Sequence, residues 1–170
     1  MVASARACAV ILIGLGANLP ADLGPPRATL EAVLRAFPRV GIGLVQLSRW
    51  YESEPQPPSD QPWYVNAIAD VATTLGPAAL LTQLHALEAE FGRVRRAPNA
   101  ARTIDLDLLA YGDKVQSGAV MLPHPRLQDR AFVLNPLVDV APEWCHPVSG
   151  RTARDLLAAL PPGQAIRVVA

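Results

Sequence analysis

The sequence has no excess of charge of either sign. Its 15 basic and 15 acidic side chains cancel, giving a formal net charge of zero at pH 7. No overall field therefore draws the protein toward a nucleic acid or an anionic membrane surface, and any anion-binding site must be local. We expect neither a nucleic-acid partner nor a membrane partner.

Cysteines and long apolar runs are also scarce. The two cysteines, Cys8 and Cys145, form no short-spaced framework or metal motif, which favours free thiols and a cytoplasmic location. Arg6 and the apolar run after it resemble a secretory signal, but the run is short and leads into glycines without a clean cleavage site. We predict a short leader over 1–8 and a buried strand over 9–14, and no segment long enough to span a bilayer.

The common glycine-rich phosphate motifs are missing as well. The stretch "GLGAN", residues 14–18, lacks the Lys-Ser/Thr pair of a P-loop and the third glycine of a dinucleotide fingerprint. Its simplest interpretation is a tight turn at the end of the first strand.

The 170 residues show no repeat or low-complexity linker, so we expect a single domain over 1–170 and a monomer. Hydrophobic periodicity predicts strands and helices that mix without strict alternation. This favours an α+β fold, with a mixed or antiparallel sheet and helices packed on it. The expected helices cover 21–37, 76–92 and 152–160, the strands cover 9–14, 41–53, 63–75, 103–111 and 165–169, and 121–142 is a loop with a short helical turn.

Two carboxylates lie inside the apolar stretch "RTIDLDLLAYGD", residues 102–113. In a strand, Asp105 and Asp107 project from one face, with Cα atoms roughly 6.6 Å apart, while Leu106 and Leu108 point to the core. Parallel carboxylates repel each other unless a cation lies between them, and Mg²⁺ suits such a pair. An exposed sheet face is the alternative interpretation of this motif.

Cationic side chains flank the acidic pair on both sides. The basic loop before it holds Arg93, Arg95, Arg96 and Arg102, and arginine is the preferred bidentate partner of phosphate. Downstream, "LPHPRLQDR" supplies His124, Arg126 and Arg130. A metal–polyphosphate site would explain this arrangement, whereas a solvated run of charges paired with helix acids is the other possibility.

A weaker signal lies in "YVN", residues 64–66. Tyr64 could stack on a flat heterocycle, and Asn66 could pair with its donor–acceptor edge. Ordinary core packing explains the same two residues equally well.

Together these motifs resemble a known family. "GLGANL", "QPWYVNA" (61–67), "LLTQLHALEAEFGRVR" (80–95), "RTIDLDLLAYGD" and "LPHPRLQDRAFVLNPL" (122–137) occur in the order found in 6-hydroxymethyl-7,8-dihydropterin pyrophosphokinases. The resemblance implies a ferredoxin-like fold and a folate-biosynthesis enzyme. Such an enzyme transfers the terminal diphosphate of ATP to the hydroxymethyl oxygen of the reduced pterin and releases AMP.

The resemblance also assigns roles to residues. It implies that Asp105 and Asp107 hold two Mg²⁺ ions and, with Arg95 and Arg102, form the catalytic set. The residues implied to bind the pterin are Ser53, Gln56, Tyr64, Asn66 and Phe132. Those implied to bind ATP are His85, Glu88, Arg93, Arg95, Arg102, His124 and Arg130.

Two other functions remain as alternatives to this expectation. A nucleotidyltransferase also uses paired aspartates on a strand, but it would release free pyrophosphate. A non-catalytic pterin- or nucleotide-binding module would consume no ATP and would tolerate loss of Asp107.

Overall fold

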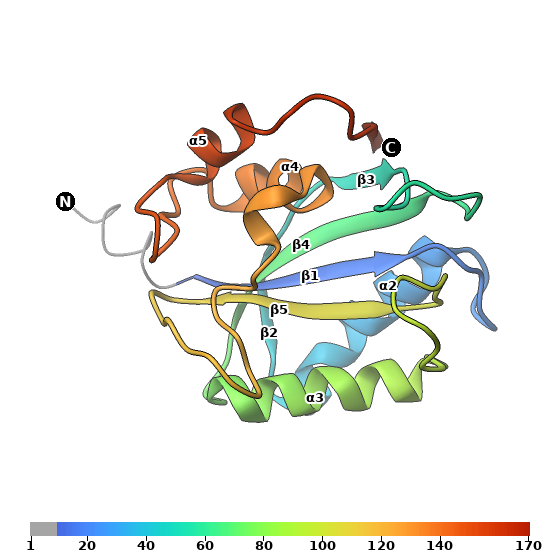
Figure 1. The fold of residues 1–170 in the computed structure, drawn as a ribbon. Helices are drawn as coiled ribbons and strands as arrows, with labels where there is room; N and C mark the ends of the chain where they lie inside the picture. The colour runs from blue at the N-terminus through green and yellow to red at the C-terminus, as the bar shows by residue number, and fades with distance from the viewer. Residues whose placement is uncertain (1–9) are drawn as a thin grey trace.

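The computed structural model describes residues 10–170 (Figure 1). The predicted leader over 1–8, Cys8 and the start of the expected first strand lie outside the described residues. Cys145 is a free, exposed thiol, as expected. Within the described part, no helix combines the length and apolar character needed to cross a membrane.

The described residues form a six-stranded sheet in which every strand pairing is antiparallel. The order is β5-β1-β4-β3-β6, with β2 also pairing with β4. The strands are β1 (Ile11–Ala17), β2 (Gly43–Leu47), β3 (Trp50–Ser53), β4 (Tyr64–Ala72), β5 (Asp105–Tyr111) and β6 (Ile166–Val169).

Helices cover both faces of this sheet, and a separate core forms on each side (Figure 1). The helices α2 (Pro26–Ala36) and α3 (Pro77–Glu90) pack on one face, and α4 (Ala131–Val140) and α5 (Ala153–Ala158) on the other. The predicted α+β, ferredoxin-like fold is thereby confirmed.

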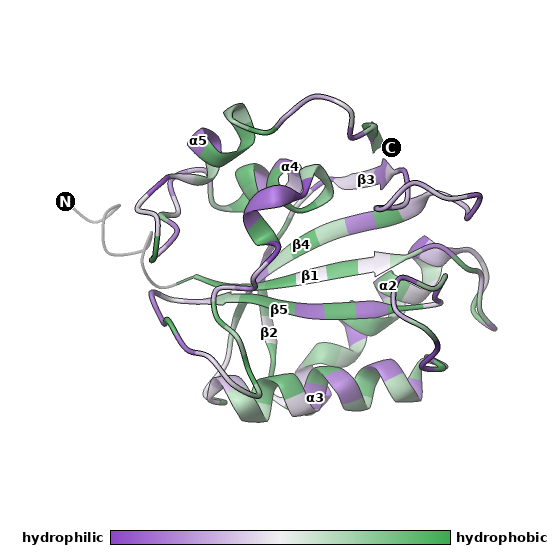
Figure 2. Cartoon of the chain, in the orientation of Figure 1, coloured by the Kyte–Doolittle hydropathy of each residue, from purple (hydrophilic) through white to green (hydrophobic). Residues whose placement is uncertain are grey.

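The acidic strand divides its side chains between the two faces as strand alternation predicts. Leu106 and Leu108 are buried in the core beneath α3, whereas Leu109 belongs to the core beneath α4. Asp105 and Asp107 lie on the α4 side, beyond the part of that face which the helix covers. Figure 2 shows hydrophilic bands on the otherwise largely hydrophobic strand β5.

The prediction of one strand over 41–53 was wrong, because β2 and β3 are separate strands. Ser48 lies between them and is buried. Its Oγ accepts a hydrogen bond from the Ile68 backbone N–H at 2.9 Å and donates to the Arg49 carbonyl at 2.8 Å. The Ser48 side chain therefore accepts the Ile68 N–H in place of a backbone carbonyl, which interrupts the strand pairing. The hydrophobic alternation over 41–53 does not reveal this interruption.

The expectation of a loop with a short helical turn over 121–142 was also wrong in its second half. Helix α4 has ten residues and contains Pro136, which removes a backbone donor and normally disfavours a helix interior. Burial of Val133, Leu134 and Leu137 against the sheet outweighs that cost. Only a short 3-10 turn over Leu127–Asp129 precedes the helix.

Helix α3 ends as the sequence predicts. Gly92 adopts a left-handed φ of 83°, the Arg93 N–H reaches the Glu88 carbonyl at 2.9 Å and the Gly92 N–H reaches that of Ala89 at 3.2 Å. This Schellman-type ending turns the chain sharply and starts the basic loop beside β5.

Candidate active site

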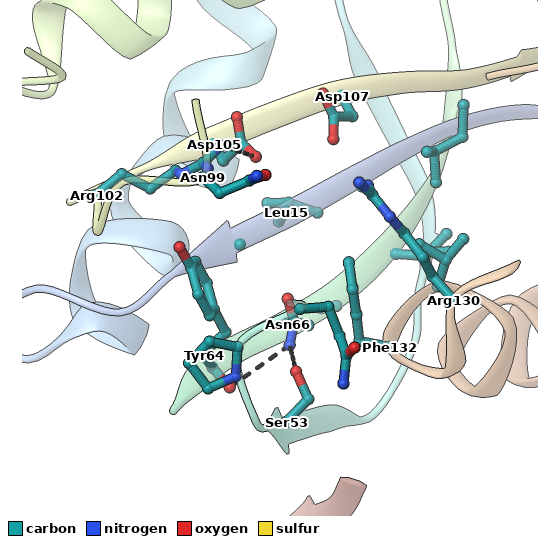
Figure 3. Close-up of a pocket in the computed structure, with 18 of the residues that line it drawn as sticks. Leu15, Ser53, Tyr64, Asn66, Asn99, Arg102, Asp105, Asp107, Arg130 and Phe132 are labelled. Carbon is teal, nitrogen blue, oxygen red and sulfur yellow. Dashed lines mark hydrogen bonds and ion pairs between the residues drawn. The ribbon is translucent and has the colours of Figure 1, made fainter. Parts of the chain in front are cut away.

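A pocket of about 260 Å³ opens on the α4 side of the sheet, next to the first turn of that helix. Figure 3 shows Asp105 and Asp107 on β5, with Tyr64, Asn66 and Phe132 on the other side of β1. The pocket brings together eleven of the fourteen predicted site residues: Ser53, Gln56, Tyr64, Asn66, Arg93, Arg102, Asp105, Asp107, His124, Arg130 and Phe132.

The floor of the pocket is the bare backbone of β1. Gly14 and Gly16 lie within that strand, opposite Asp107 and Asp105 on β5. The interpretation of "GLGAN" as a turn was therefore wrong. A Cβ at Gly16 would lie 3.2 Å from Asn66 Oδ1, and one at Gly14 would lie 3.2 Å from a Leu109 methyl group. Larger residues would fill the floor, and the i, i+2 spacing of the glycines is the signal that reasoning from the sequence missed.

Asp105 is held by two arginines of the basic loop. Arg102 Nη1 lies 2.8 Å from Asp105 Oδ2, and the Arg93 guanidinium forms an ion pair with the other oxygen. Arg93 also pairs with Glu88, so one cation bridges α3 and β5. The positive charge that the sequence places before the strand thus converges on the first aspartate.

Glu88 anchors this arrangement from beneath. Its side chain is 2% exposed, and its Oε1 accepts the Leu106 backbone N–H at 2.7 Å. Burial raises the pKa of Glu88, while this hydrogen bond and the charge of Arg93 oppose the rise. Glu88 therefore fixes the start of β5 and the position of Arg93, and it does not line the pocket.

Asp107 has a different environment from its neighbour. Burial, followed by repulsion from Asp105, raises the pKa of Asp107 to about 7, although Arg130 and Arg102 oppose the rise. The carboxylate form is therefore costly in the protein alone. A cation bound between the two aspartates would remove that cost.

His124 and Arg130 complete the cationic side of the pocket. His124 Nδ1 accepts the Arg126 backbone N–H at 3.2 Å, which leaves Nε2–H as the ring's donor. Burial and the nearby charge of Arg130 lower the pKa of His124, so the ring is neutral at pH 7. The Arg130 guanidinium lies 5.3 Å from the Phe132 ring centroid, and burial lowers its pKa too.

Uncharged groups fix the amide in the opposite half of the pocket. Asn66 is 4% exposed, and its Nδ2 donates to Ser53 Oγ at 2.8 Å, which fixes the plane of the amide (Figure 3). The rings of Tyr64 and Phe132 lie on either side of this amide. This half is therefore a slot with an aromatic residue on each side of a fixed amide.

A buried asparagine joins the two halves. Asn18 is 2% exposed; its Nδ2 donates to Gln61 Oε1 at 3.1 Å, and its Oδ1 accepts the Arg102 backbone N–H at 2.9 Å. Gln61 Nε2 in turn donates to the Asn99 carbonyl at 2.9 Å. The proline-rich loop and the basic loop are therefore tied through "GLGANL" and "QPWYVNA", but neither amide was among the predicted site residues.

Three predicted ATP-binding residues do not line the pocket. His85 is exposed on α3, Glu88 is buried beneath the pocket, and the exposed Arg95 lies 3.7 Å from Glu88 Oε2.

The residues present fit a magnesium–phosphate site. Among the described residues no three His, Cys, Asp or Glu side chains gather into a cage that could hold a metal by itself. Mg²⁺ needs no such cage, since it binds through one or two carboxylates and takes its other ligands from water and substrate phosphates. Asp105 and Asp107 would supply those carboxylates.

Comparison with known proteins agrees with this geometry. Residues 12–142 match the family model for 7,8-dihydro-6-hydroxymethylpterin-pyrophosphokinase. The chain belongs to this family. It is therefore a pyrophosphokinase of folate biosynthesis, an ATP-dependent enzyme that acts on 6-hydroxymethyl-7,8-dihydropterin.

Curated relatives cover most of the chain. The 2-amino-4-hydroxy-6-hydroxymethyldihydropteridine pyrophosphokinase of Pseudomonas aeruginosa is 42% identical over 153 residues, covering 89% of this chain and 91% of its own. The Synechocystis protein of the same name is 38% identical over 152 residues, covering 88% and 75% respectively.

Solved structures share the fold at low sequence identity. A Plasmodium falciparum HPPK-DHPS triple mutant aligns with a TM-score of 0.67 and 14% identity, covering 88% of this pyrophosphokinase. The present chain spans only 44% of that longer chain. At this identity the likeness supports the fold alone.

Proposed function

We propose that the pocket transfers the terminal diphosphate of ATP to the hydroxymethyl oxygen of the pterin, with phosphates on the β5 half and pterin on the β3–β4 half. One observation carries this assignment: the acidic pair and its arginines face the amide-and-aromatic slot across the bare glycine backbone of β1. The two substrates would meet over Gly14 and Gly16, which have no side chains of their own.

Asp105 and Asp107 would hold two Mg²⁺ ions together with the phosphate oxygens of ATP. When bound, these ions would neutralise phosphate charge and lower the pKa of a coordinated hydroxyl. Asp105 would exchange its arginines for metal, which frees Arg93 and Arg102 to bind phosphate bidentately. Both arginines already line the pocket.

The pterin would lie between the rings of Tyr64 and Phe132. Asn66 would read its amide-like edge with the Oδ1 that lies beside Gly16, while Ser53 fixes the amide plane. The backbone around Ser53 and Gln56 would complete the slot. Stacking on two aromatic faces and pairing with one fixed amide suit a flat heterocycle.

For this transfer the protein needs mainly to orient the two substrates and to stabilise the phosphate charge. The pterin hydroxyl oxygen would form a bond to the β-phosphorus of ATP as the bond from that phosphorus to the α-phosphate oxygen breaks. The electron pair leaves with AMP, and the hydroxyl proton passes to solvent. Arg102, Arg130 and the neutral His124 would donate to phosphate oxygens throughout, which fits a reaction governed by orientation and electrostatics.

The roles of His85 and Arg95, the domain organisation, the oligomeric state and the location are further proposals. We propose that His85 and Arg95 contact the part of ATP that extends beyond the pocket toward α3, with Arg95 approaching the phosphates as its loop closes. We propose also that residues 1–170 act as one domain, as a monomer in the cytoplasm. Gel filtration of the full chain with light scattering would check the monomer.

Product analysis tests the proposed function. The protein is incubated with ATP, Mg²⁺ and 6-hydroxymethyl-7,8-dihydropterin, and the nucleotides are separated. We expect AMP to appear in step with diphosphorylated pterin, and only when the pterin is present. ADP would indicate single phosphoryl transfer, and free pyrophosphate would indicate a nucleotidyltransferase; either result would overturn the proposal.

A further inference from the structure

The first turn of α4 is fixed by a residue from the end of the chain. The backbone N–H of Ala131 donates to Gln164 Oε1 at 2.8 Å, and Gln164 Nε2 donates to the Asp129 carbonyl at 2.9 Å. The residue at the helix's own N-cap, Arg130, makes no capping hydrogen bond. Gln164 therefore caps α4 from a segment more than thirty positions away in sequence.

The next residue holds the opposite rim of the pocket. The Glu54 N–H donates to the Ala165 carbonyl at 3.2 Å, and the Ala165 N–H donates to Glu54 Oε1 at 2.9 Å. The same Glu54 oxygen accepts from Gln56 Nε2 at 3.3 Å. Glu54 and Gln56 line the pocket, so two adjacent residues join its proline-rich rim to its helical rim.

This connection lies beside the proposed pterin slot and away from the acidic strand. Figure 1 shows the C-terminal segment running from α5 back to β3, where β6 pairs with it. At its other end α4 is anchored separately, because Asp139 accepts from Tyr51 Oη at 2.9 Å and pairs with Arg49 at 2.7 Å. Gln164 therefore controls only the end of α4 that carries Phe132.

We infer that Gln164 and Ala165 form a strap that sets the width of the pterin slot, and that Gln164 is a positioning residue for pterin binding. This inference rests on the proposed function of the same pocket. The strap holds the loop that contains Gln56 at a fixed distance from the helix that presents Phe132. Its loss lets the two walls move apart, while Asp105, Asp107 and the basic loop keep their places.

Steady-state kinetics of Gln164→Ala tests the strap. Loss of the two side-chain hydrogen bonds predicts a pterin KM about three- to tenfold higher. The KM for ATP and kcat at saturating pterin are expected to change by less than about twofold. Of the proposed phosphate-binding residues, Arg130 is the one whose chain neighbours Gln164 holds, and Asp105, Asp107 and the basic loop lie on the other side of the pocket. Gln164→Glu keeps an acceptor for the Ala131 N–H at a helix N-terminus, so its pterin KM should lie closer to that of the wild type.

Gln46→Ala is the matched control, since Gln46 is exposed on β2 far from the pocket, and it should leave all parameters unchanged. A purely structural role of Gln164 would lower the amount of active enzyme, and so kcat, at constant pterin KM; that result overturns the strap. Equal increases in pterin KM for Gln164→Ala and Gln164→Glu would overturn the capping role. A wild-type protein that forms no AMP would instead defeat the proposed function.

Discussion

The two halves of the pocket are built in opposite ways. On the half proposed to bind the pterin, the buried amide of Asn66 is fixed by a neutral hydrogen bond to Ser53. On the half proposed to bind phosphate, Asp105 is neutralised by ion pairs with Arg93 and Arg102. The pKa of Asp107 is raised to about 7. Under the proposed function, the first half would bind its ligand without exchanging partners, whereas the acidic pair of the second would exchange its arginines for metal and phosphate.

This contrast predicts its largest effect on the phosphate half. Asp105→Ala removes one proposed metal ligand and is expected to lower kcat by ~1000-fold or more, since electrostatic stabilisation is the main contribution in such a transfer. The fold should persist, because Leu106 and Leu108 still occupy the core. AMP formation and circular dichroism measure the two effects.

Asp113→Ala is the control for this change, because Asp113 is exposed in the turn after β5. It should retain full activity. An unfolded Asp105→Ala protein would mean that the aspartate is structural and would contradict the assignment.

On the pterin half, Asn66→Ala is expected to lower kcat/KM for the pterin by about 100-fold, since a buried polar edge loses its partner. The affinity for an ATP analogue should stay within about threefold. Calorimetric titration of each ligand separates the two effects. Equal losses for both ligands would show that the halves are not independent.

The pKa of Asp107 predicts how metal binding depends on pH. With a pKa raised to about 7 by burial and by Asp105, this carboxyl is mostly protonated at pH 6 and mostly ionised at pH 8. Mg²⁺ binds the ionised form and displaces the proton, so apparent affinity should rise about tenfold between these values. Calorimetry in buffers of different ionisation enthalpy would detect the released proton. A flat profile would contradict the raised pKa.

The smallest effect is expected where the halves meet. Asn18→Ala breaks the tie to Gln61 and to the Arg102 backbone, so it should weaken both substrates together, each by about fivefold. In this variant, binding of one substrate should also increase the affinity for the other by a smaller factor than in the wild type. Titrating each ligand with and without the other measures this coupling, and an undiminished coupling would argue against the tie.

Local alternation was enough to predict the phosphate half. The i, i+2 spacing of Asp105 and Asp107, with a leucine between them, is sufficient to place both carboxylates on one face of a strand. The nearby arginines indicate the kind of ligand. Both inferences need only the geometry of a strand and the chemistry of its neighbours in sequence.

Other features depended on contacts between distant residues. The stretch 121–142 was predicted to be a loop with a short helical turn, and only burial against the sheet shows why α4 forms around Pro136. Gly14 and Gly16 suggested a turn. The structure shows instead that Leu109 and Asn66, on neighbouring strands, approach these glycines too closely for a side chain, and the local sequence does not show this. Asn18 and Gln61 carry no signal of their meeting, since 43 positions separate them.

The central claim is that Asp107 serves metal and phosphate binding at a cost to the empty protein, and Asp107→Asn tests it most directly. A raised folded-state pKa means that the protonated form stabilises the protein below about pH 4, and that this contribution is lost as the pH rises through about 7. At pH 8 without Mg²⁺, the neutral amide should therefore make the variant more stable than the wild type by about 1–2 kcal/mol in urea unfolding. The same variant should form no AMP. A less stable variant, or one that still releases AMP at the wild-type rate, would contradict the account.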